Sequence, residues 1–557
     1  MPTSIEFPSS VTRDSRLRSS TFRRASVQHA LQLLALVTAA GLVSLWRGQD
    51  ANWDLQNYHY YNPWAWWNGR IFDRDIAAAQ LQTFHNPLFD LPFFAMVQWD
   101  WPPRVIAFVL AMPAGIAAFF YLKLLPLLFD DMPRREREVA VACAFAIGMT
   151  SAMGIATIGT TMNEWPGVAL VMAALWLVVR ALARTNAGTL PAGAVCLAGV
   201  LVGIATGGKL TAAMFAVALC AAILFRTPRG RMGVRGSLRE AGLFGAGVVV
   251  GVAVTLGPWA FSLWSHFDSP LFPYFNNFFK SQWWDIGPVL ERRYGPHTLE
   301  GWLTFPFHLI GPGENFVTEV RYRDARFPVA WGLAIVAGAA WLSFRITNKP
   351  MPKATPAMSA IWRLTGVFFV LSFLIWTAQH SIYRYIVLLD VLAGAIIVTL
   401  LARLVRPGYL PAIATIAAIA LITTTRVADW WHVGFGDQWF EVHAPPLAPG
   451  ALVLLTTDAP VAYLLPMLGA DARFVGARNT IVDPGRKNKL AQSVRDAVRT
   501  HAGPLYQLTS PPGAGADALA AHGLRRPDGA CLLVESNINA TGVELCRLLR
   551  VQDGPSP

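Results

Sequence analysis

Charged residues are scarce in this sequence. Only 14% of its 557 residues are Asp, Glu, Lys or Arg, whereas 54% are hydrophobic. That balance excludes an ordinary soluble protein and indicates a polytopic membrane protein. The net charge of +12 comes largely from arginines in short clusters between apolar segments, as in the cytoplasmic loops of membrane proteins. We therefore attribute the basic charge to membrane topology and expect no nucleic-acid partner.

Lysine is scarce even among the basic residues, with 7 lysines against 39 arginines. This ratio is typical of a GC-rich bacterial genome. We therefore expect an integral protein of a bacterial inner membrane whose functional face lies in the periplasm.

Several motifs that would indicate other chemistry are absent. The sequence contains no P-loop, dinucleotide fingerprint or nucleophile elbow, so nucleotide-driven transport has no support. His59, His85 and His380 lack metal-ligand spacing, and no metal site is predicted. No cofactor is certain, although a divalent cation stays open. Cys531 and Cys546 could form a disulfide, which nothing in the sequence requires.

Eleven segments are long and apolar enough to be predicted as membrane spans, each of about 20 residues as helix. They cover residues 27–46, 104–128, 139–159, 163–182, 190–207, 210–226, 241–264, 327–345, 361–379, 382–402 and 409–426. Residues 1–26, rich in Ser and Arg, are predicted to be a disordered basic segment in the cytoplasm. With this end inside, the basic clusters share the cytoplasmic side.

The opposite side then carries outer loops of residues 47–103 and 265–326 and the C-terminal tail. Within the first loop, the apolar piece Pro87–Trp99 is too short to cross and is predicted to be an interfacial helix. Beyond residue 430, Ala451–Thr457 reads as a buried strand and residues 487–501 as helix. The predicted fold is a polytopic α-helical membrane domain over 27–429 followed by a small extracytoplasmic α/β domain over 430–557.

Asp54 lies just outside the first predicted span, beside Trp53, Tyr58 and His59. A carboxylate among aromatics at a membrane exit is partly desolvated, which raises its basicity and suits a general base. A solvated loop aspartate is the alternative. Ion pairs within the loop are expected for the charged residues that follow, Arg70, Asp73, Arg74 and Asp75.

Three more ionisable residues are predicted to face the same side as Asp54. Glu164 begins the fourth span, where it either takes part in chemistry or stabilises the helix N-terminus by ~0.3–1 kcal/mol. Lys209 follows Gly207 and Gly208 in a turn that could approach a phosphate, with snorkelling to the interface as the alternative. Arg384 lies at the outer start of the tenth span, where a topology anchor is not expected, and a bidentate phosphate contact is predicted.

Together these residues resemble the GT-C superfamily of integral membrane glycosyltransferases, which take a sugar from a polyprenyl-phosphate carrier. The resemblance covers about residues 27–426, with an N-in first helix and an acidic residue early in a large first outer loop. The segment from Asp54 to Arg70 is similar to the Asp, Tyr-His, Trp and Gly pattern of many bacterial members. On this resemblance, Asp54 and Glu164 are the catalytic residues. Those assigned to substrate binding are Tyr58, His59, Arg70, Lys209, His380, Arg384 and Tyr385.

The resemblance implies a hexosyl- or pentosyltransferase that moves a sugar from a polyprenyl phosphate to an extracytoplasmic glycan, lipid or protein. It implies inversion, with Asp54 as general base and with Lys209 and Arg384 stabilising the leaving phosphate. A transporter or flippase of lipid-linked glycans is the alternative, but it predicts charged groups deep in several spans, whereas Arg and Lys concentrate at span ends. An assembly protein is a third, although eleven spans exceed what an anchor requires.

Overall fold

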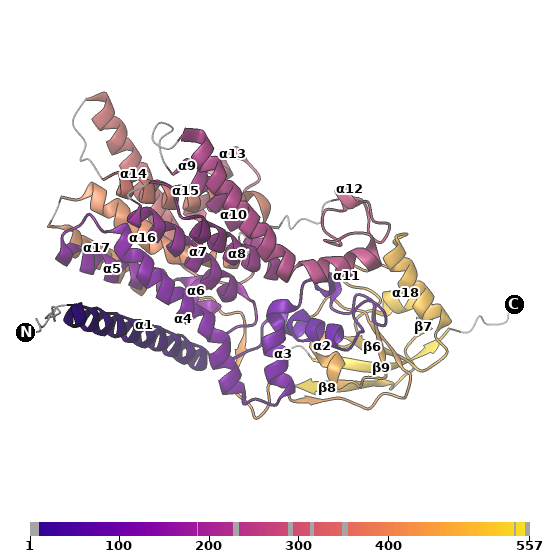
Figure 1. Ribbon diagram of the computed structural model, residues 1–557. Coiled ribbons are helices and arrows are strands. Elements are labelled where there is room, and N and C mark those ends of the chain that lie inside the picture. The colour runs from indigo at the N-terminus through magenta and orange to yellow at the C-terminus, as the bar shows by residue number, and fades with distance from the viewer. Residues whose placement is uncertain are drawn as a thin grey trace, which may run out of the picture.

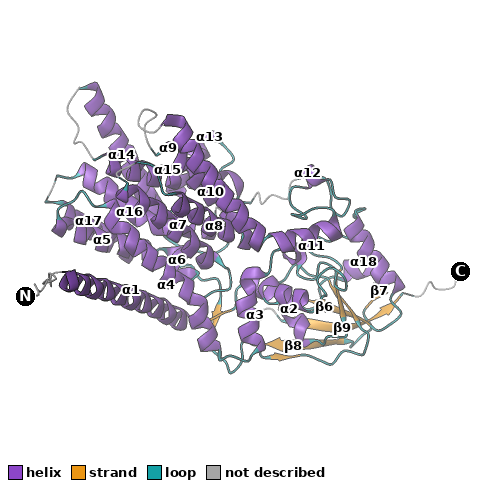
Figure 2. Ribbon diagram, viewed as in Figure 1, coloured by secondary structure: helices purple, strands orange, loops and turns teal. Residues whose placement is uncertain are grey.

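The computed structural model describes residues 11–185, 188–226, 233–287, 293–311, 317–347, 355–406, 408–539 and 542–551. A bundle of helices forms one end of the molecule and a sheet domain forms the other (Figure 1). Figure 2 shows that the longer strands lie in the sheet domain. The predicted architecture, helical membrane part followed by an α/β part, is therefore confirmed.

Helices occupy all eleven predicted hydrophobic segments. They are α1 (Val11–Arg47), α4 (Pro103–Leu128), α5 (Arg134–Met149), α7 (Glu164–Arg184), α8 (Ala192–Gly208), α9 (Ala213–Phe225), α10 (Gly233–Thr255), α14 (Arg326–Ile346), α15 (Pro356–Gln379), α16 (Val387–Leu404) and α17 (Leu410–Thr424). Shorter helices connect them: α2 (Tyr61–Trp67), α3 (Leu91–Gln98), α6 (Ala152–Ala156), α11 (Gly257–Phe267), α12 (Asn276–Phe279) and α13 (Leu299–His308).

Seven helices in the described part of the chain are long and apolar enough to cross a membrane, not eleven. They are α1 from Ser26, α4, α7, α10 from Arg235, α14, α15 and the segment Tyr383–Leu404. The other four predicted segments form α5, α8, α9 and α17, which have 13 to 17 residues and fall short of the roughly 20 that a straight crossing needs.

Two predicted spans are interrupted, and one predicted disordered segment is helical. The segment 139–159 stops at Met149, and Ser151 then caps the short helix α6. The segment 241–264 breaks at Leu256, because Pro258 lies in the first turn of the new helix α11. Proline suits a helix first turn. Helix α1 begins at Val11, so only residues 1–10 of the predicted disordered segment lie outside the described residues.

Glycines bring α8 and α10 into backbone contact. Gly199 and Gly203 are four residues apart on α8, as are Gly247 and Gly251 on α10. A Cβ at Gly203 would overlap the carbonyl oxygen of Val248, and a Cβ at any of the other three would also overlap a carbonyl of the opposite helix. Small residues at this spacing are the means by which membrane helices pack closely.

The C-terminal domain is built on a seven-stranded mixed sheet in the order β3-β8-β9-β6-β4-β5, with β7 paired to β9. Its strands are β3 (Val442–His443), β4 (Leu452–Leu455), β5 (Arg473–Gly476), β6 (Leu505–Thr509), β7 (Leu524–Arg525), β8 (Cys531–Ser536) and β9 (Val543–Arg550), and its helices are α18 (Lys489–Thr500) and α19 (Ala516–Ala521). Cys531 and Cys546 face each other across β8 and β9 and form a disulfide, which settles the pairing that the sequence leaves open.

The first outer loop and the C-terminal domain share one hydrophobic core. The ring centroids of Tyr60 and Phe440 lie 4.6 Å apart, and those of Phe93 and Trp439 lie 5.2 Å apart. Ile76 forms a parallel bridge with Val475 at the edge of the sheet. A two-stranded sheet of β1 (Gln49–Asp50) and β2 (His432–Val433) joins the end of α1 to the start of the tail. The predicted interfacial helix, observed as α3, contributes Phe93 to this core and leaves Trp99 exposed.

Candidate active site

The loop that carries Asp54 folds locally as a π-helix, η1 (Leu55–His59), for which Asp54 is the N-terminal flanking residue. A π-helix is rare and is often found at functional sites. The Oδ1 atom of Asn52 accepts a hydrogen bond of 2.9 Å from the backbone N–H of Leu55, which fixes the start of the turn. Asp54, Tyr58 and His59 are all buried there.

A second buried carboxylate fixes this loop to the helical bundle. Asp50 accepts hydrogen bonds from the side chain of Asn52 at 2.7 Å and from the backbone N–H of Thr161 at 2.8 Å. Thr161 precedes α7, so the Asp54 loop and the start of α7 are held together. The short segment Gln49–Asp50, just beyond the first predicted span, therefore positions the site.

Glu164, Lys209 and Arg384 reach Asp54 from three other segments. Asn163 adopts a left-handed conformation (φ 64°) immediately before α7, which asparagine tolerates better than most residues. Lys209 lies in extended conformation after α8, and Arg384 lies in the 3₁₀ segment η5 (Tyr383–Ile386) before α16.

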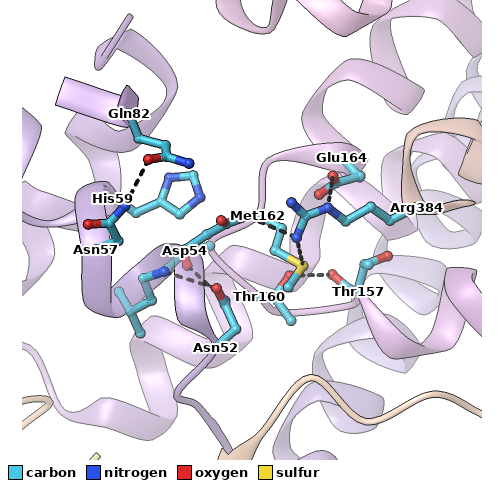
Figure 3. Close-up of polar contacts among 12 residues, drawn as sticks. Asn52, Asp54, Asn57, His59, Gln82, Thr157, Thr160, Met162, Glu164 and Arg384 are labelled. Atoms are coloured by element: carbon cyan, nitrogen blue, oxygen red, sulfur yellow. Dashed lines mark hydrogen bonds and ion pairs between the residues drawn. The ribbon is translucent and has the colours of Figure 1, made fainter. Parts of the chain in front are cut away.

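Two carboxylates and two cations form one connected cluster, and Figure 3 shows Arg384 between Asp54 and Glu164. The Nη1 atom of Arg384 lies 2.9 Å from Oδ2 of Asp54, and its Nε atom lies 3.8 Å from Oε1 of Glu164. The Nζ atom of Lys209 lies 2.6 Å from the same Glu164 oxygen. Nη1 of Arg384 also contacts the Met162 sulfur at 3.5 Å. These contacts bring Asp54, Glu164, Lys209 and Arg384 together, and the roles that the sequence assigns to them stay predictions.

Tyr385 and His380 form an aromatic edge to the cluster. The Lys209 Nζ atom lies 5.2 Å from the Tyr385 ring centroid, and the Arg384 guanidinium carbon lies 5.5 Å from it. Cations at this distance from a ring face are attracted to it. The half-buried His380 ring packs edge-on against Tyr385, with 5.7 Å between centroids. Both residues therefore lie beside the charged cluster.

A cavity of about 30 Å³ opens between Asn163, Glu164, Lys209, Arg384 and Tyr385. That volume holds about one water molecule. A phosphate group is larger than this cavity. Lys209 and Arg384 both bind protein carboxylates here, an arrangement that we call the closed state.

The charges around Asp54 reverse the effect of its burial. Burial alone would raise the pKa of Asp54, but Arg384 lowers it, with smaller contributions from His59, Lys209 and His85, and the pKa ends below its ordinary value. Burial lowers the pKa of His85 to about 4, so that ring is neutral at neutral pH. The raised basicity predicted for Asp54 is thus wrong for this closed state, because its partner Arg384 is 330 positions away in sequence.

Arg70 does not belong to the cluster, which corrects its predicted role in substrate binding. Its guanidinium forms a buried bidentate pair with Asp75 at 2.9 and 3.0 Å and donates to the backbone carbonyls of Ala470 and Ala472. The expected ion pair of Arg70 with Asp75 is therefore confirmed, whereas Asp73 pairs with His266. Arg70 holds the first loop to the C-terminal domain.

Sequence reasoning missed Asp90. This residue lies in the 3₁₀ segment η3 (Leu88–Asp90) and is buried beside His59, with its Oδ1 atom 2.7 Å from Nδ1 of His59. Its position in the sequence could have indicated this role. Asp90 interrupts the apolar segment Pro87–Trp99, and a carboxylate buried in such a segment needs a partner.

The donor atoms at the cluster do not fit a divalent cation. Arg384 already bridges Asp54 and Glu164, so its guanidinium lies where a metal between those carboxylates would have to bind. Within the described residues, three ligand-type side chains come close enough for a metal at Cys531, Glu544 and Cys546, and the two sulfurs there are joined as a disulfide.

No protein-family model matches the chain, and no curated protein matches it in sequence. Among solved structures, the chain is similar to ArnT from Cupriavidus metallidurans bound to undecaprenyl phosphate, with a TM-score of 0.50 and 14% identity over 93% of this chain and 97% of that one. It is also similar to the apo oligosaccharyltransferase of Archaeoglobus fulgidus, with a TM-score of 0.45 and 12% identity over 86% of this chain and 69% of that one. The likeness to ArnT shows which fold the chain has.

Proposed function

Because the chain has a GT-C-like fold, we propose that it is a membrane glycosyltransferase that moves a sugar from a polyprenyl phosphate to an extracytoplasmic acceptor. The similar structure of ArnT holds undecaprenyl phosphate, and we extend that class of ligand to this chain. The acceptor is a glycan, lipid or protein of the cell envelope, and the membrane is a bacterial inner membrane with the site on its periplasmic face. The disulfide of the tail supports that face, because disulfides persist in oxidising compartments.

One observation carries the proposal. Asp54, Glu164, Lys209 and Arg384 come from four separate segments and meet in one buried cluster beside a small cavity. Buried charges that converge on a cavity are the arrangement expected of a binding or catalytic site.

The chemistry follows from the two kinds of charge. An acceptor hydroxyl attacks the anomeric carbon, the bond from that carbon to the phosphate oxygen breaks, and the electron pair leaves with the polyprenyl phosphate. Asp54 takes the hydroxyl proton as general base, and a single displacement inverts the anomeric centre. Lys209 and Arg384 bind the phosphate, whose negative charge grows as it leaves, and such stabilisation is commonly the largest catalytic contribution in a dry site.

Donor binding also makes Asp54 a better base. Arg384 is the largest influence that lowers the pKa of Asp54, and burial opposes it. When a lipid phosphate draws the guanidinium toward itself, burial dominates and the affinity of Asp54 for a proton rises. The base is therefore activated only when the donor is in place.

Binding of undecaprenyl phosphate to the purified protein in nanodiscs tests the proposal. Lys209→Ala and Arg384→Ala each remove a cation from the cluster, and we expect each to weaken binding by at least about tenfold, because charge-assisted contacts contribute roughly 1.5–3 kcal/mol. Lys123→Ala is the matched control, since Lys123 contacts Gln32 and Phe119 away from the cluster. Equal binding by all three variants and the wild type would refute a phosphate site here.

A further inference from the structure

A second polar group lies on the side of Asp54 away from Arg384. The Nδ1 atom of His59 is 2.7 Å from Oδ1 of Asp90, and the side-chain amide of Asn163 donates to the same oxygen at 2.5 Å. His59 and Asp90 are 2% and 4% exposed. This is a buried pair in which a carboxylate orients an imidazole.

The other ring nitrogen of His59 has no partner. Its Nε2 atom is buried and has no hydrogen-bond partner within the described part of the chain. Because the Asp90 carboxylate accepts a hydrogen bond from Nδ1–H, the neutral ring presents its lone pair at Nε2. A buried acceptor left free in this way is costly unless a ligand or a proton uses it.

The π-helix η1 places His59 near Asp54. It follows Asp54 by five residues across the π-helix η1, and five is the hydrogen-bonding period of that helix. In Figure 3 the Asp54 side chain lies between His59 and Arg384. The two groups are close enough for His59 to influence the Asp54 carboxylate electrostatically.

The proposed reaction leaves the acceptor's proton on Asp54, and Asp54 must lose it before the next turnover. After transfer, the proton is on Asp54 and the polyprenyl phosphate is free to leave. When Arg384 then returns to Asp54, it favours the ionised carboxylate and expels the proton. Asp54 is 7% exposed, so the proton cannot pass directly to water until the site opens, and a nearby imidazole, ordinarily a stronger base than a carboxylate, can take it first.

We propose that His59, oriented by Asp90, receives this proton from Asp54 and so resets the site for the next turnover. The O–H bond on Asp54 breaks, an N–H bond forms at Nε2, and Asp90 stabilises the resulting imidazolium. The proton passes to water when the site opens for product release. This inference rests on the proposed glycosyl transfer, in which His59 acts after the chemical step.

Other titratable groups surround His59. Tyr58 and Asp54 lie on its own segment, His85 on the loop before η3, Asp90 on η3 and Lys209 after α8. His85 is an unsuitable carrier, since its Nε2 is already bonded to the Tyr274 hydroxyl at 2.9 Å.

The test separates the first turnover from later ones. Purified protein in nanodiscs is given undecaprenyl-phosphate hexoses and pentoses labelled in the sugar, with membrane extract from cells lacking the protein as the source of acceptor. For His59→Gln we expect a first turnover near the wild-type rate, followed by a steady-state rate about 100-fold lower, within the range for loss of a proton-transfer group. Imidazole in the buffer should restore part of the steady-state rate, and Asp90→Asn should change the rates in the same direction.

His266→Gln is the matched control, because this half-exposed histidine on α11 pairs with Asp73, and it should keep the wild-type steady state. The inference is overturned if His59→Gln turns over like the wild type. It is also overturned if its first turnover and steady state fall together without imidazole rescue. A wild-type protein that neither binds undecaprenyl phosphate nor transfers sugar would instead refute the proposed function, and this inference with it.

Discussion

At Asp54, burial and charge act in opposite directions. Burial raises the pKa of the carboxyl, but Arg384 at 2.9 Å together with the smaller effects of His59, Lys209 and His85 lowers it by more, so the group is ionised at neutral pH. A general base with a lowered pKa is active above that pKa and loses activity as the pH falls through it. The lowered pKa belongs to the protein without donor, so the acidic decline that Asp54 sets in kcat/KM, which reports the free protein, lies below its ordinary range near pH 4.

Replacing Arg384 should move this acidic decline. In Arg384→Gln the largest pKa-lowering influence is gone while burial remains, so the pKa of Asp54 rises and activity is lost at a higher pH than in the wild type. We also expect a rate at the optimum roughly 10²–10³-fold lower, as for loss of one charge-stabilising group. The measurement is kcat/KM for transfer against pH for the wild type, Arg384→Gln and Arg384→Lys.

The Lys variant keeps the charge, so its acidic decline should stay near that of the wild type. A decline at the same pH in all three proteins would show that Arg384 does not control the ionisation of Asp54.

The sequence predicted which charged residues gather at the site better than it predicted what they do there. Sidedness brought Asp54, Glu164, Lys209 and Arg384 together, because each lies at the outer end of a span. It could not separate Arg70 from them, since Arg70 lies on the same outer loop and only the folded chain shows its carbonyl partners in the tail. Asp90 escaped notice because its partner, His59, is 31 residues away.

At the scale of elements, hydropathy located the eleven helices at the predicted segments, but it did not predict where two of those segments are interrupted. A hydropathy pattern continues unchanged across Leu256, where the structure ends α10 and starts α11. The π-helix η1 has only five residues, which are too few for hydrophobic periodicity to predict it. The element most important for the site is the first loop, which Arg70 helps to hold to the C-terminal domain.

Arg70→Ala should weaken the attachment of this loop to the C-terminal domain. The variant leaves the Asp75 carboxylate buried without its partner, and such a loss typically lowers the free energy of unfolding by about 3–5 kcal/mol. Thermal unfolding of the purified protein in detergent, followed by fluorescence, measures the change. Arg74→Ala is the control on the same loop, because Arg74 is only half-buried and its guanidinium donates to the backbone carbonyl of Asp471 without a carboxylate partner among the described residues.

A double variant sharpens this experiment. Arg70→Met with Asp75→Leu removes both charges, so we expect it to recover part of the stability that Arg70→Ala loses. If Arg70→Ala and Arg74→Ala unfold at the same temperature, the buried pair does not hold the loop.

For the whole molecule, the membrane part and the tail are joined through the loop that carries Asp54. The sequence indicated the two parts and the class of each. It could not indicate that residues 49–50 pair with residues 432–433, or that Ile76 extends the sheet at Val475, because such pairings across about 400 residues leave no local pattern. The C-terminal domain therefore supports the candidate site structurally, as well as forming a domain of its own.

The central claim is sugar transfer from a polyprenyl phosphate at Asp54. Mass spectrometry of lipids and envelope glycans from cells lacking the protein, complemented with wild type or Asp54→Asn, tests it most directly. We predict accumulation of a polyprenyl-phosphate sugar and a glycan short by one hexose or pentose, both corrected by the wild type and not by Asp54→Asn. A complete lipid-linked glycan retained on the inner leaflet, with no sugar missing, would contradict transfer and indicate a transporter.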